Sequence, residues 1–335
     1  MTISTRDSEG YNCRAQAPAG SGRRAAGSTR DDKVLLSAAS CLLNKRGAQN
    51  KGRNREAKYC CMAPAHGINA VRYAFFGLNM PTVKVEGRTI HYLTGANGIA
   101  PGRRNIIFLH GAGGNGFAWQ NQRRGLDRGV NTICVDLPGH GQSSGPSCAS
   151  IGAYSSWLLN FIDSLGLTGV IAAGHSMGGA VSLEAAIEYP EMLEALILVG
   201  TGARLRVSPE IFQSLESDFN TNAERLLRKS YGPGSPKKLI KWGLEHLLSE
   251  VPEVVLADFR ACNEFDRMDD IVQIKKPALV LCGSEDRMTP PKYSQYLAEK
   301  LERGTLRIVD EAGHMAMVEK PFEVNASILK FLATL

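Results

Sequence analysis

Regular patterns of apolar and polar residues begin at Met80 and continue to the end of the chain. From Met80 to Thr94 apolar and polar residues alternate, which is typical of strands with one buried face. Glu86-Gly87 interrupts this alternation and predicts a tight turn between two strands. Residues 1–79 are rich in Gly, Ser, Ala, Arg and Asn and have no sustained helical or strand period. We therefore expect residues 1–79 to be a disordered, dispensable extension and a folded domain to begin at Met80.

Short apolar runs follow the predicted hairpin and alternate with stretches of helical pattern. This alternation argues for an α/β fold, a mostly parallel sheet with helices on both faces. The runs are Ile106–Leu109, Thr132–Val135, Val170–Ala173, Leu196–Val199, Ala278–Cys282 and Thr305–Val309.

A long interruption over residues 203–275 separates the fourth apolar run from the fifth. It contains several helical patterns, and Ser208-Pro209 is a good start for the first of them. A helical insertion at this place predicts a cap, residues 203–275, over a pocket at the end of the sheet, and a core made of residues 80–202 and 276–335. The predicted helices of the cap are Glu210–Phe219, Ala223–Tyr231, Pro236–Glu250 and Pro252–Phe265.

The formal net charge of +6 is carried by the N-terminal segment. Residues 1–79 hold 13 Lys and Arg against 5 Asp and Glu, whereas residues 80–335 hold 26 against 28. A diffuse basic segment is typical of solvated chain, so the charge does not favour a nucleic-acid partner. No apolar run has the length of a membrane span, and we expect no membrane partner.

The eight cysteines show no spacing typical of a zinc site. Cys134 and Cys282 lie inside apolar runs, where cysteine usually serves as a small buried hydrophobe. We expect a reduced, cytoplasmic protein without structural disulfides or metal. The apolar run Val34–Leu43 leaves open secretion or lipid attachment at Cys41, but it begins after more than thirty polar residues.

The strongest candidate for catalysis is Ser176, in the sequence Gly174-His-Ser-Met-Gly178. This Gly-x-Ser-x-Gly pattern follows the apolar run Val170–Ala173 and precedes a helical pattern. In that context it predicts a strained turn that lifts the serine hydroxyl to a helix N-terminus, where free amides favour negative charge. The structural alternative is a helix-capping serine in a glycine-rich turn.

A serine nucleophile needs a base and a group that orients the base. His314 lies in a loop just after the last predicted strand and is the candidate base. Asp286 lies at the end of the fifth run and is the candidate acid, with Glu285 as the immediate alternative. The order Ser176, Asp286, His314 matches the serine–acid–histidine order of one hydrolase fold and differs from chymotrypsin and subtilisin.

The glycine-rich loop after Ile106–Leu109 supplies a candidate oxyanion hole. Its open backbone can aim the Ala112 amide at the same point as the Met177 amide. The same loop contains Gly-x-Gly-x-x-Gly, and Asp136 follows 25 residues after Gly111, as in a dinucleotide-binding fingerprint. This alternative would leave the serine turn, Asp286 and His314 unexplained, and we expect no cofactor.

These motifs together resemble the α/β-hydrolase superfamily, in its serine-nucleophile branch with the carboxylesterases. The matching segments are His110-Gly-Ala-Gly-Gly114, Asp136-Leu-Pro-Gly-His-Gly-Gln-Ser143, Gly174-His-Ser-Met-Gly-Gly179, Gly283-Ser-Glu-Asp286 and Gly313-His314. The resemblance covers about residues 80–335. It implies an eight-stranded sheet, a helical cap after the sixth strand and a cofactor-free triad of Ser176, Asp286 and His314. It also implies an oxyanion hole formed by the Ala112 and Met177 amides.

Apolar residues near the catalytic loops and in the cap suggest an apolar acyl or aryl pocket. No Arg or Lys is placed convincingly for a substrate carboxylate, which favours a neutral ester as the substrate. We expect hydrolysis of esters of small to medium apolar acids through an acyl-enzyme, by a monomer or small homo-oligomer. Lactone or carbon–carbon bond hydrolysis and slow-turnover ligand sensing remain alternatives. The candidate substrate contacts are Trp119, Phe212, Trp242, Met288 and Met315.

Overall fold

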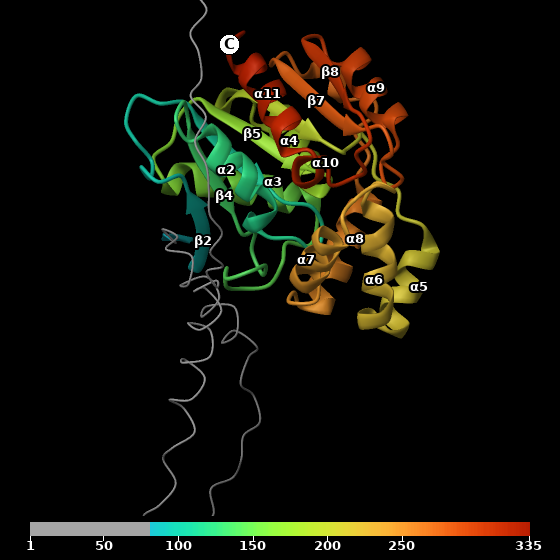
Figure 1. The fold of residues 1–335 in the computed structure, drawn as a ribbon. Coiled ribbons are helices and arrows are strands. Elements are labelled where there is room, and N and C mark those ends of the chain that lie inside the picture. The colour runs from blue at the N-terminus through green and yellow to red at the C-terminus, as the bar shows by residue number, and fades with distance from the viewer. Residues whose placement is uncertain (1–80) are drawn as a thin grey trace, which may run out of the picture. The chain divides into compact units, whose positions relative to one another are not determined.

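A computed structural model describes residues 81–335, which contain one eight-stranded sheet flanked by helices (Figure 1). The strand order is β1-β2-β4-β3-β5-β6-β7-β8. Strands β1 and β2 are antiparallel additions at one edge, and all pairs from β4 to β8 are parallel. The predicted α/β fold is thus confirmed, whereas the expectation for residues 1–79 lies outside the described residues. The strands are β1 Thr82–Val85, β2 Arg88–Thr94, β3 Asn105–Leu109, β4 Asn131–Val135, β5 Val170–His175, β6 Leu193–Val199, β7 Ala278–Gly283 and β8 Gly304–Val309.

The first two strands form the predicted hairpin, with its turn at Glu86-Gly87. Val85 pairs with Arg88, so only two residues make the turn. Both turn residues have positive φ, 51° for Glu86 and 78° for Gly87. Positive φ at both central positions is the geometry that matches the right-handed twist of a hairpin.

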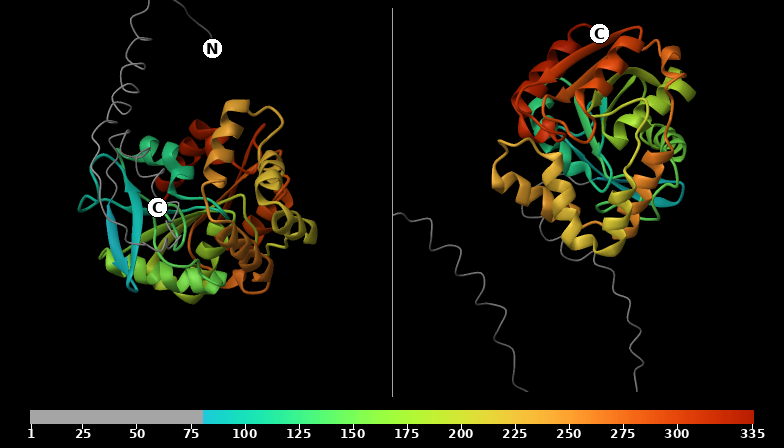
Figure 2. Two further views of the ribbon diagram at one scale, coloured as in Figure 1. Left: turned by 90° about the horizontal axis from the view of Figure 1, so that it is seen from below. Right: turned by 90° about the vertical axis from the view of Figure 1, so that its right-hand side faces the viewer.

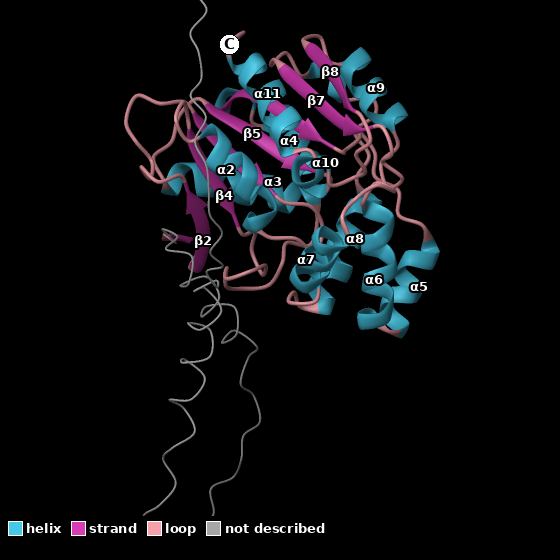
Figure 3. Ribbon diagram, in the orientation of Figure 1, coloured by secondary structure: helices cyan, strands magenta, loops and turns pink. Residues whose placement is uncertain are grey.

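Helices cover both faces of the sheet (Figure 3). Successive residues of each strand point to opposite faces, so a strand of apolar residues contributes side chains to both layers of the core. In β3, Ile107 and Leu109 join the apolar cluster under α3 and α4, whereas Ile106 and Phe108 join the cluster under α2 and α11. Strands β4, β5 and β7 are buried along their whole length, as expected for a parallel sheet covered on both faces. The helices of the core are α2 Gln120–Leu126, α3 Ile151–Ser164, α4 Met177–Glu188, α9 Pro291–Lys300, α10 Ala316–Glu319 and α11 Pro321–Leu332, and short 3-10 helices are η1 Gly116–Trp119, η2 Pro190–Met192 and η3 Ile271–Gln273.

Four helices lie between β6 and β7 and gather at one end of the sheet (Figure 2). They are α5 Pro209–Ser217, α6 Phe219–Ser230, α7 Lys237–Leu247 and α8 Pro252–Glu264, and we call residues 203–275 the cap. An isolated bridge between Arg204 and Asp266 joins the segments that enter and leave this insertion.

The predicted boundary between the first two cap helices is wrong. The pattern placed Phe219 at the end of the first cap helix, but α5 ends at Ser217 and Phe219 begins α6. The cause is Asp218, which has an extended backbone and accepts a hydrogen bond from the Thr221 amide at 3.1 Å. An aspartate in this role caps the start of a new helix.

Candidate active site

Ser176 occupies the sharp turn between β5 and α4. Its backbone angles are φ 51° and ψ −113°, a region that residues with a side chain rarely adopt. The glycines of the motif are there because the turn leaves no room for a side chain. A Cβ at Gly174 would lie 2.0 Å from the Gly178 carbonyl oxygen, and one at Gly178 would lie 2.4 Å from the Leu109 carbonyl oxygen.

Hydrogen bonds from the neighbouring strand hold this strained turn in place. The Ser176 amide donates to the Val199 carbonyl at 2.9 Å, and the Thr201 hydroxyl donates to the Ser176 carbonyl at 2.8 Å. The serine side chain itself caps no helical amide. The alternative of a helix-capping serine therefore has no support in the geometry.

His314 and Asp286 meet in the loops that follow β8 and β7. The His314 Nδ1 lies 2.9 Å from Asp286 Oδ2, and both side chains are buried. Burial acts to raise the pKa of Asp286, but the charge and hydrogen bond of His314, aided by hydrogen bonds from Thr289, hold that pKa below its usual value. Glu285, the alternative acid, is exposed and has no contact with His314 among the described residues.

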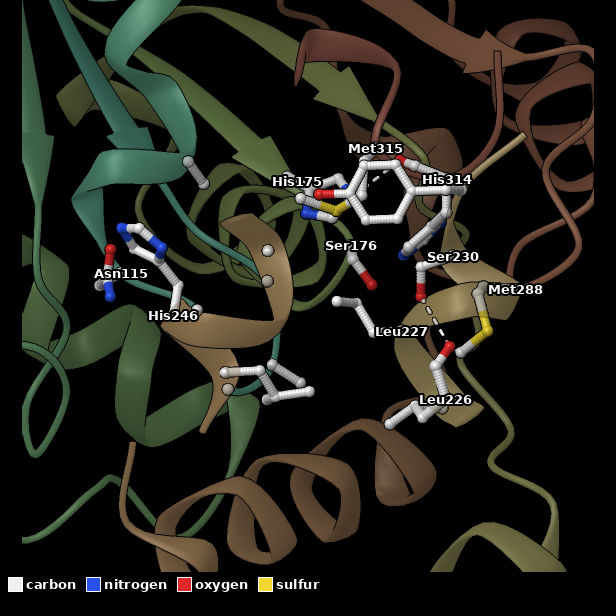
Figure 4. Close-up of a pocket in the computed structure, with 18 of the residues that line it drawn as sticks. Asn115, His175, Ser176, Leu226, Leu227, Ser230, His246, Met288, His314 and Met315 are labelled. Carbon is white, nitrogen blue, oxygen red and sulfur yellow. Dashed lines mark hydrogen bonds between the residues drawn. The ribbon is translucent and has the colours of Figure 1, made fainter. Parts of the chain in front are cut away.

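A second buried histidine, His175, holds the backbone of His314. The Nε2 of His175 donates to the His314 carbonyl at 3.0 Å. Burial and the neighbouring His314 lower the pKa of His175 to about 3, so its ring is neutral at ordinary pH. Figure 4 shows the Ser176 hydroxyl beside the His314 ring at the wall of a pocket that both residues line.

Of the two predicted oxyanion residues, Ala112 lines both pockets with Ser176, and Met177 follows Ser176 in the chain. Ala112 lies in the loop after β3, and Met177 is the first residue of α4, where helical amides have no intrahelical partner. Within residues 81–335, neither the Ala112 amide nor the Met177 amide donates a hydrogen bond to the protein. Both donors are therefore available to a substrate oxygen.

Two buried carboxylates of the cap reach the loops of the core, and sequence reasoning missed both. Asp258 of α8 is fully buried and accepts hydrogen bonds from the Gly113 amide at 2.9 Å, from His140 Nε2 at 2.8 Å and from the Tyr154 hydroxyl at 2.8 Å. Burial alone would lower the pKa of His140, but the Asp258 carboxylate outweighs it and raises the pKa to about 9. Asp258 and His140 thus form a buried ion pair. The sequence signal was an aspartate on the otherwise apolar face of α8, between Val255 and Ala261.

Glu250, between α7 and α8, makes a similar bridge. Its carboxylate accepts hydrogen bonds from Asn115 Nδ2 at 2.9 Å and from the Gly141 amide at 3.0 Å. Burial raises the pKa of Glu250 to about 7. Each of the two cap carboxylates therefore joins the oxyanion loop, residues 110–115, to the loop of residues 137–144.

The carboxylate of Asp136, the acid of the dinucleotide-like pattern, is hydrogen-bonded to residues of the core. It accepts hydrogen bonds from His91 Nδ1 and the Gly116 amide, both at 2.7 Å, and from the Gln142 amide at 3.0 Å. These contacts join β2, η1 and the loop of residues 137–144, and the buried carboxylate lines neither of the pockets that contain Ser176.

Two pockets meet at Ser176 and His314. The narrow pocket has a volume of about 110 Å³ and an apolar lining that includes Trp242, Met288 and Met315, three of the predicted substrate contacts. The Tyr231 hydroxyl in this lining is buried and has no hydrogen-bond partner among the described residues.

Two of the predicted substrate contacts line neither pocket at Ser176. Trp119 is fully buried in the core, where its Nε1 donates to the Leu109 carbonyl at 3.1 Å and its ring packs on Phe108. Phe212 lies on α5 but lines neither pocket. Both contacts were predicted from aromatic character, which does not determine whether a side chain enters a pocket.

The wide pocket has a volume of about 350 Å³ and brings basic side chains to the site of Ser176, where the sequence had shown no Arg or Lys placed convincingly for a substrate carboxylate. It is lined by four cationic side chains and one acidic side chain. They are Arg206, Arg225, Lys229, Arg287 and Glu210.

Membrane-spanning helices and metal sites were two other features expected to be absent. No helix among them is long and apolar enough to cross a membrane. No group of three or more His, Cys, Asp or Glu side chains within residues 81–335 is arranged to hold a metal ion.

Comparison with known proteins gives matches over most of the described residues. A model of the alpha/beta hydrolase family matches residues 106–327. The (E)-2-((N-methylformamido)methylene)succinate hydrolase of Acinetobacter baylyi is 26% identical over 257 residues, which cover 74% of this chain and 96% of that protein. A 2-hydroxy-6-oxononadienedioate/2-hydroxy-6-oxononatrienedioate hydrolase of Burkholderia vietnamiensis is 28% identical, over 72% of this chain and 90% of that protein. The solved structure of a thermophilic esterase has 30% identity and a TM-score of 0.67, over 77% of this chain and 98% of the esterase.

Proposed function

This chain belongs to the alpha/beta hydrolase family, and on that premise we propose that it is a serine hydrolase that cleaves carboxylic esters with small to medium apolar parts. The observation that carries the proposal is the strained Ser176 at a pocket wall that it shares with His314, whose ring is held by Asp286 at 2.9 Å. A nucleophile, a base and an orienting acid in this order along the chain are the requirements for acyl transfer.

In the proposed reaction His314 takes the proton of the Ser176 hydroxyl as the oxygen attacks the ester carbonyl. Asp286 holds the His314 ring with Nε2 directed to the serine and stabilises the imidazolium that forms. The amides of Ala112 and Met177 donate to the negative oxygen of the tetrahedral intermediate. His314 then gives its proton to the leaving alcohol, an acyl-enzyme forms on Ser176, and a water molecule activated by His314 releases the acid.

The narrow pocket supports a neutral, apolar part in the substrate. Its lining contains aliphatic and aromatic side chains and methionine, with no Lys, Arg, Asp or Glu. Its volume of about 110 Å³ favours short chains. The solved thermophilic esterase, which is 30% identical, supports this proposal by its name.

The test is the hydrolysis of p-nitrophenyl esters from acetyl to dodecanoyl by the intact protein and by Ser176→Ala. We expect turnover of the short esters, a decline toward dodecanoyl, and a loss of about a millionfold in kcat for the variant if the triad acts as a unit. Far-ultraviolet circular dichroism of the variant provides the control for folding. A folded intact protein that hydrolyses none of these esters would contradict the proposal.

Carbon–carbon bond hydrolysis is the second candidate function. The observation that favours it is the 28% identity to a hydrolase whose name specifies a 2-hydroxy-6-oxononadienedioate. Measuring kcat/KM for such a dienoate and for p-nitrophenyl butanoate distinguishes the two functions. Only a carbon–carbon hydrolase would show the higher kcat/KM for the dienoate.

A further inference from the structure

The wide pocket is lined by charged side chains that take no part in the proposed attack of Ser176. Among its lining residues are Arg206, Arg225, Lys229 and Arg287, and the only acidic one is Glu210. The narrow pocket has neither a basic nor an acidic side chain apart from histidines. A neutral pocket and a cationic pocket therefore meet at Ser176 and His314.

Of the cations, Arg206 is already paired. Its guanidinium donates to Asp266 Oδ2 at 3.1 Å and to the Asn263 carbonyl at 2.6 Å. Arg225, Lys229 and Arg287 have no ion pair or hydrogen bond to a carboxylate within residues 81–335. Three positive charges thus border the wide pocket without an acidic partner from residues 81–335.

The arrangement of these three cations points to an anion between them. Arg225 and Lys229 are four residues apart on α6 and therefore share one face, where like charges repel each other. Arg287 reaches the same pocket from the loop after β7. Convergence of cations from two separate elements creates a positive potential that favours a negatively charged group of the substrate.

We propose that the wide pocket is an anion subsite and that the substrate is a carboxylic ester with one further carboxylate. This inference rests on the proposed serine-hydrolase function. The apolar part of the substrate lies in the narrow pocket, the ester carbonyl lies at Ser176, and the second carboxylate lies among Arg225, Lys229 and Arg287. The expectation of a neutral ester, drawn from the sequence, is replaced by this one.

Two matched pairs of esters test the subsite. The p-nitrophenyl monoester of succinic acid and p-nitrophenyl butanoate differ by a carboxylate in the acyl half. The compound 4-(butanoyloxy)benzoate and its methyl ester differ by a carboxylate in the alcohol half. For at least one pair, we expect kcat/KM to be about tenfold higher for the anionic member at low ionic strength, and the advantage to shrink as salt is added. The pair that shows it identifies the half that enters the wide pocket.

Variants connect this preference to the named residues. In the triple variant Arg225→Gln, Lys229→Gln, Arg287→Gln, the ratio of anionic to neutral kcat/KM should fall to about one, by about two- to fivefold per cation removed. Glu210→Gln removes the negative charge of the pocket and should increase the ratio. Arg228→Gln is the matched control, because Arg228 lies on the same helix but pairs with Glu224 at 2.6 Å and lines neither pocket.

The outcomes separate the subsite from the proposed function. Neutral esters hydrolysed with dependence on Ser176, but without an anionic preference, would overturn the subsite alone. An equal drop of the ratio in Arg228→Gln and in the triple variant would overturn it as well. If no ester is hydrolysed, the proposed function fails, and calorimetric titration of Ser176→Ala with the same four compounds decides the subsite. Tighter binding of an anionic member supports it, and equal binding within both pairs contradicts it.

Discussion

At the scale of single residues, the Asp286 carboxylate is held from several directions. One oxygen accepts hydrogen bonds from the Met288 and Thr289 amides, at 2.8 and 2.9 Å. The other faces His314 Nδ1 and the Thr289 hydroxyl, both at 2.9 Å. These contacts fix the position of the carboxylate. From this position it can both orient the His314 ring and stabilise its positive charge, so we expect its negative charge to matter for catalysis.

The first residue-scale prediction is that Asp286→Asn lowers kcat for p-nitrophenyl butanoate by about ten-thousandfold with little change in KM. The amide can still occupy the site, but it favours the wrong tautomer of His314 and cannot stabilise the imidazolium. Steady-state kinetics measure the effect. Glu285→Gln is the control, because Glu285 is the adjacent acidic residue and is exposed. A similar loss in both variants would mean that Asp286 is not the orienting acid.

The glycines of the serine turn give a second prediction. Gly174→Ala should lower the melting temperature and abolish ester hydrolysis, because the new Cβ would lie 2.0 Å from backbone atoms of Gly178 that cannot move aside. Gly129→Ala provides the comparison, since a Cβ there meets no atom within 4 Å. Calorimetry and activity are measured together. A Gly174→Ala protein as stable and active as Gly129→Ala would show that the turn can accommodate a Cβ at residue 174.

The sequence predicted the residues of the site that depend on local pattern, but not those that depend on packing. Ser176, Asp286 and His314 each follow a predictable strand, and the carboxyl ends of parallel strands meet at one edge of a sheet. Trp119 and Phe212 follow no such rule, because whether an aromatic side chain enters a pocket depends on how helices cross. The wide pocket was missed for the same reason, since Arg225 and Arg287 lie on elements far apart in the sequence.

At the scale of elements, the cap and the core are joined through buried charge. Asp258 of α8 contacts Gly113 in the oxyanion loop and His140 in the loop after β4. Removing one partner of a buried ion pair leaves the other charge without compensation, which typically costs about 3–5 kcal/mol. The position of the oxyanion loop should therefore depend on a residue of the cap.

The element-scale prediction concerns Asp258→Asn and pH. The pKa of His140 is raised to about 9 in the folded protein, so its contribution to stability is complete below its ordinary pKa near 6.5 and is lost as the pH rises through about 9. We expect the melting temperature of the intact protein to fall between pH 7 and pH 10. Asp258→Asn should be less stable at pH 7, should show less of that alkaline fall, and should have a lower kcat for short esters.

Calorimetry across this pH range provides the measurement, with Asp163→Asn as control because Asp163 is exposed on α3. An Asp258→Asn protein with the same alkaline profile as the intact protein would contradict the ion pair. A normal kcat in a less stable variant would separate stability from the position of the oxyanion loop.

The elements themselves were largely predictable, because each strand is a short apolar run between loops and each cap helix has an amphipathic pattern. Their boundaries were less predictable. Asp218 ends one helix and begins the next through a single side-chain hydrogen bond, which the period of apolar residues does not reveal. The two cap carboxylates were missed because their partners come from distant loops.

At the scale of the whole molecule, the contacts described above for the candidate site lie within residues 81–335. The family model matches residues 106–327 and leaves the hairpin β1–β2 outside its range. The hairpin is nevertheless part of the sheet, since β2 pairs with β4 and Leu93 is buried. Its His91 Nδ1 lies 2.7 Å from Asp136 Oδ2, and Asp136 also accepts hydrogen bonds from the Gly116 and Gln142 amides.

The prediction at this scale compares two shortened chains. A chain that begins at Met80 keeps both hairpin strands, and we expect it to have the melting temperature and the ester kcat/KM of the full chain. A chain that begins at Gly95 lacks β1 and β2, so β4 becomes an edge strand, Asp136 loses His91, and the apolar side chains that packed on the hairpin meet water. It should unfold at a much lower temperature or fail to fold. Loss of activity in the chain from Met80 would show that residues 1–79 contribute to function, whereas full activity in the chain from Gly95 would show that the oxyanion loops do not need the hairpin. The pair of chains therefore tests whether the catalytic unit begins at the hairpin, as the hydrogen bond from His91 to Asp136 implies, or at the first parallel strand, where the family match begins.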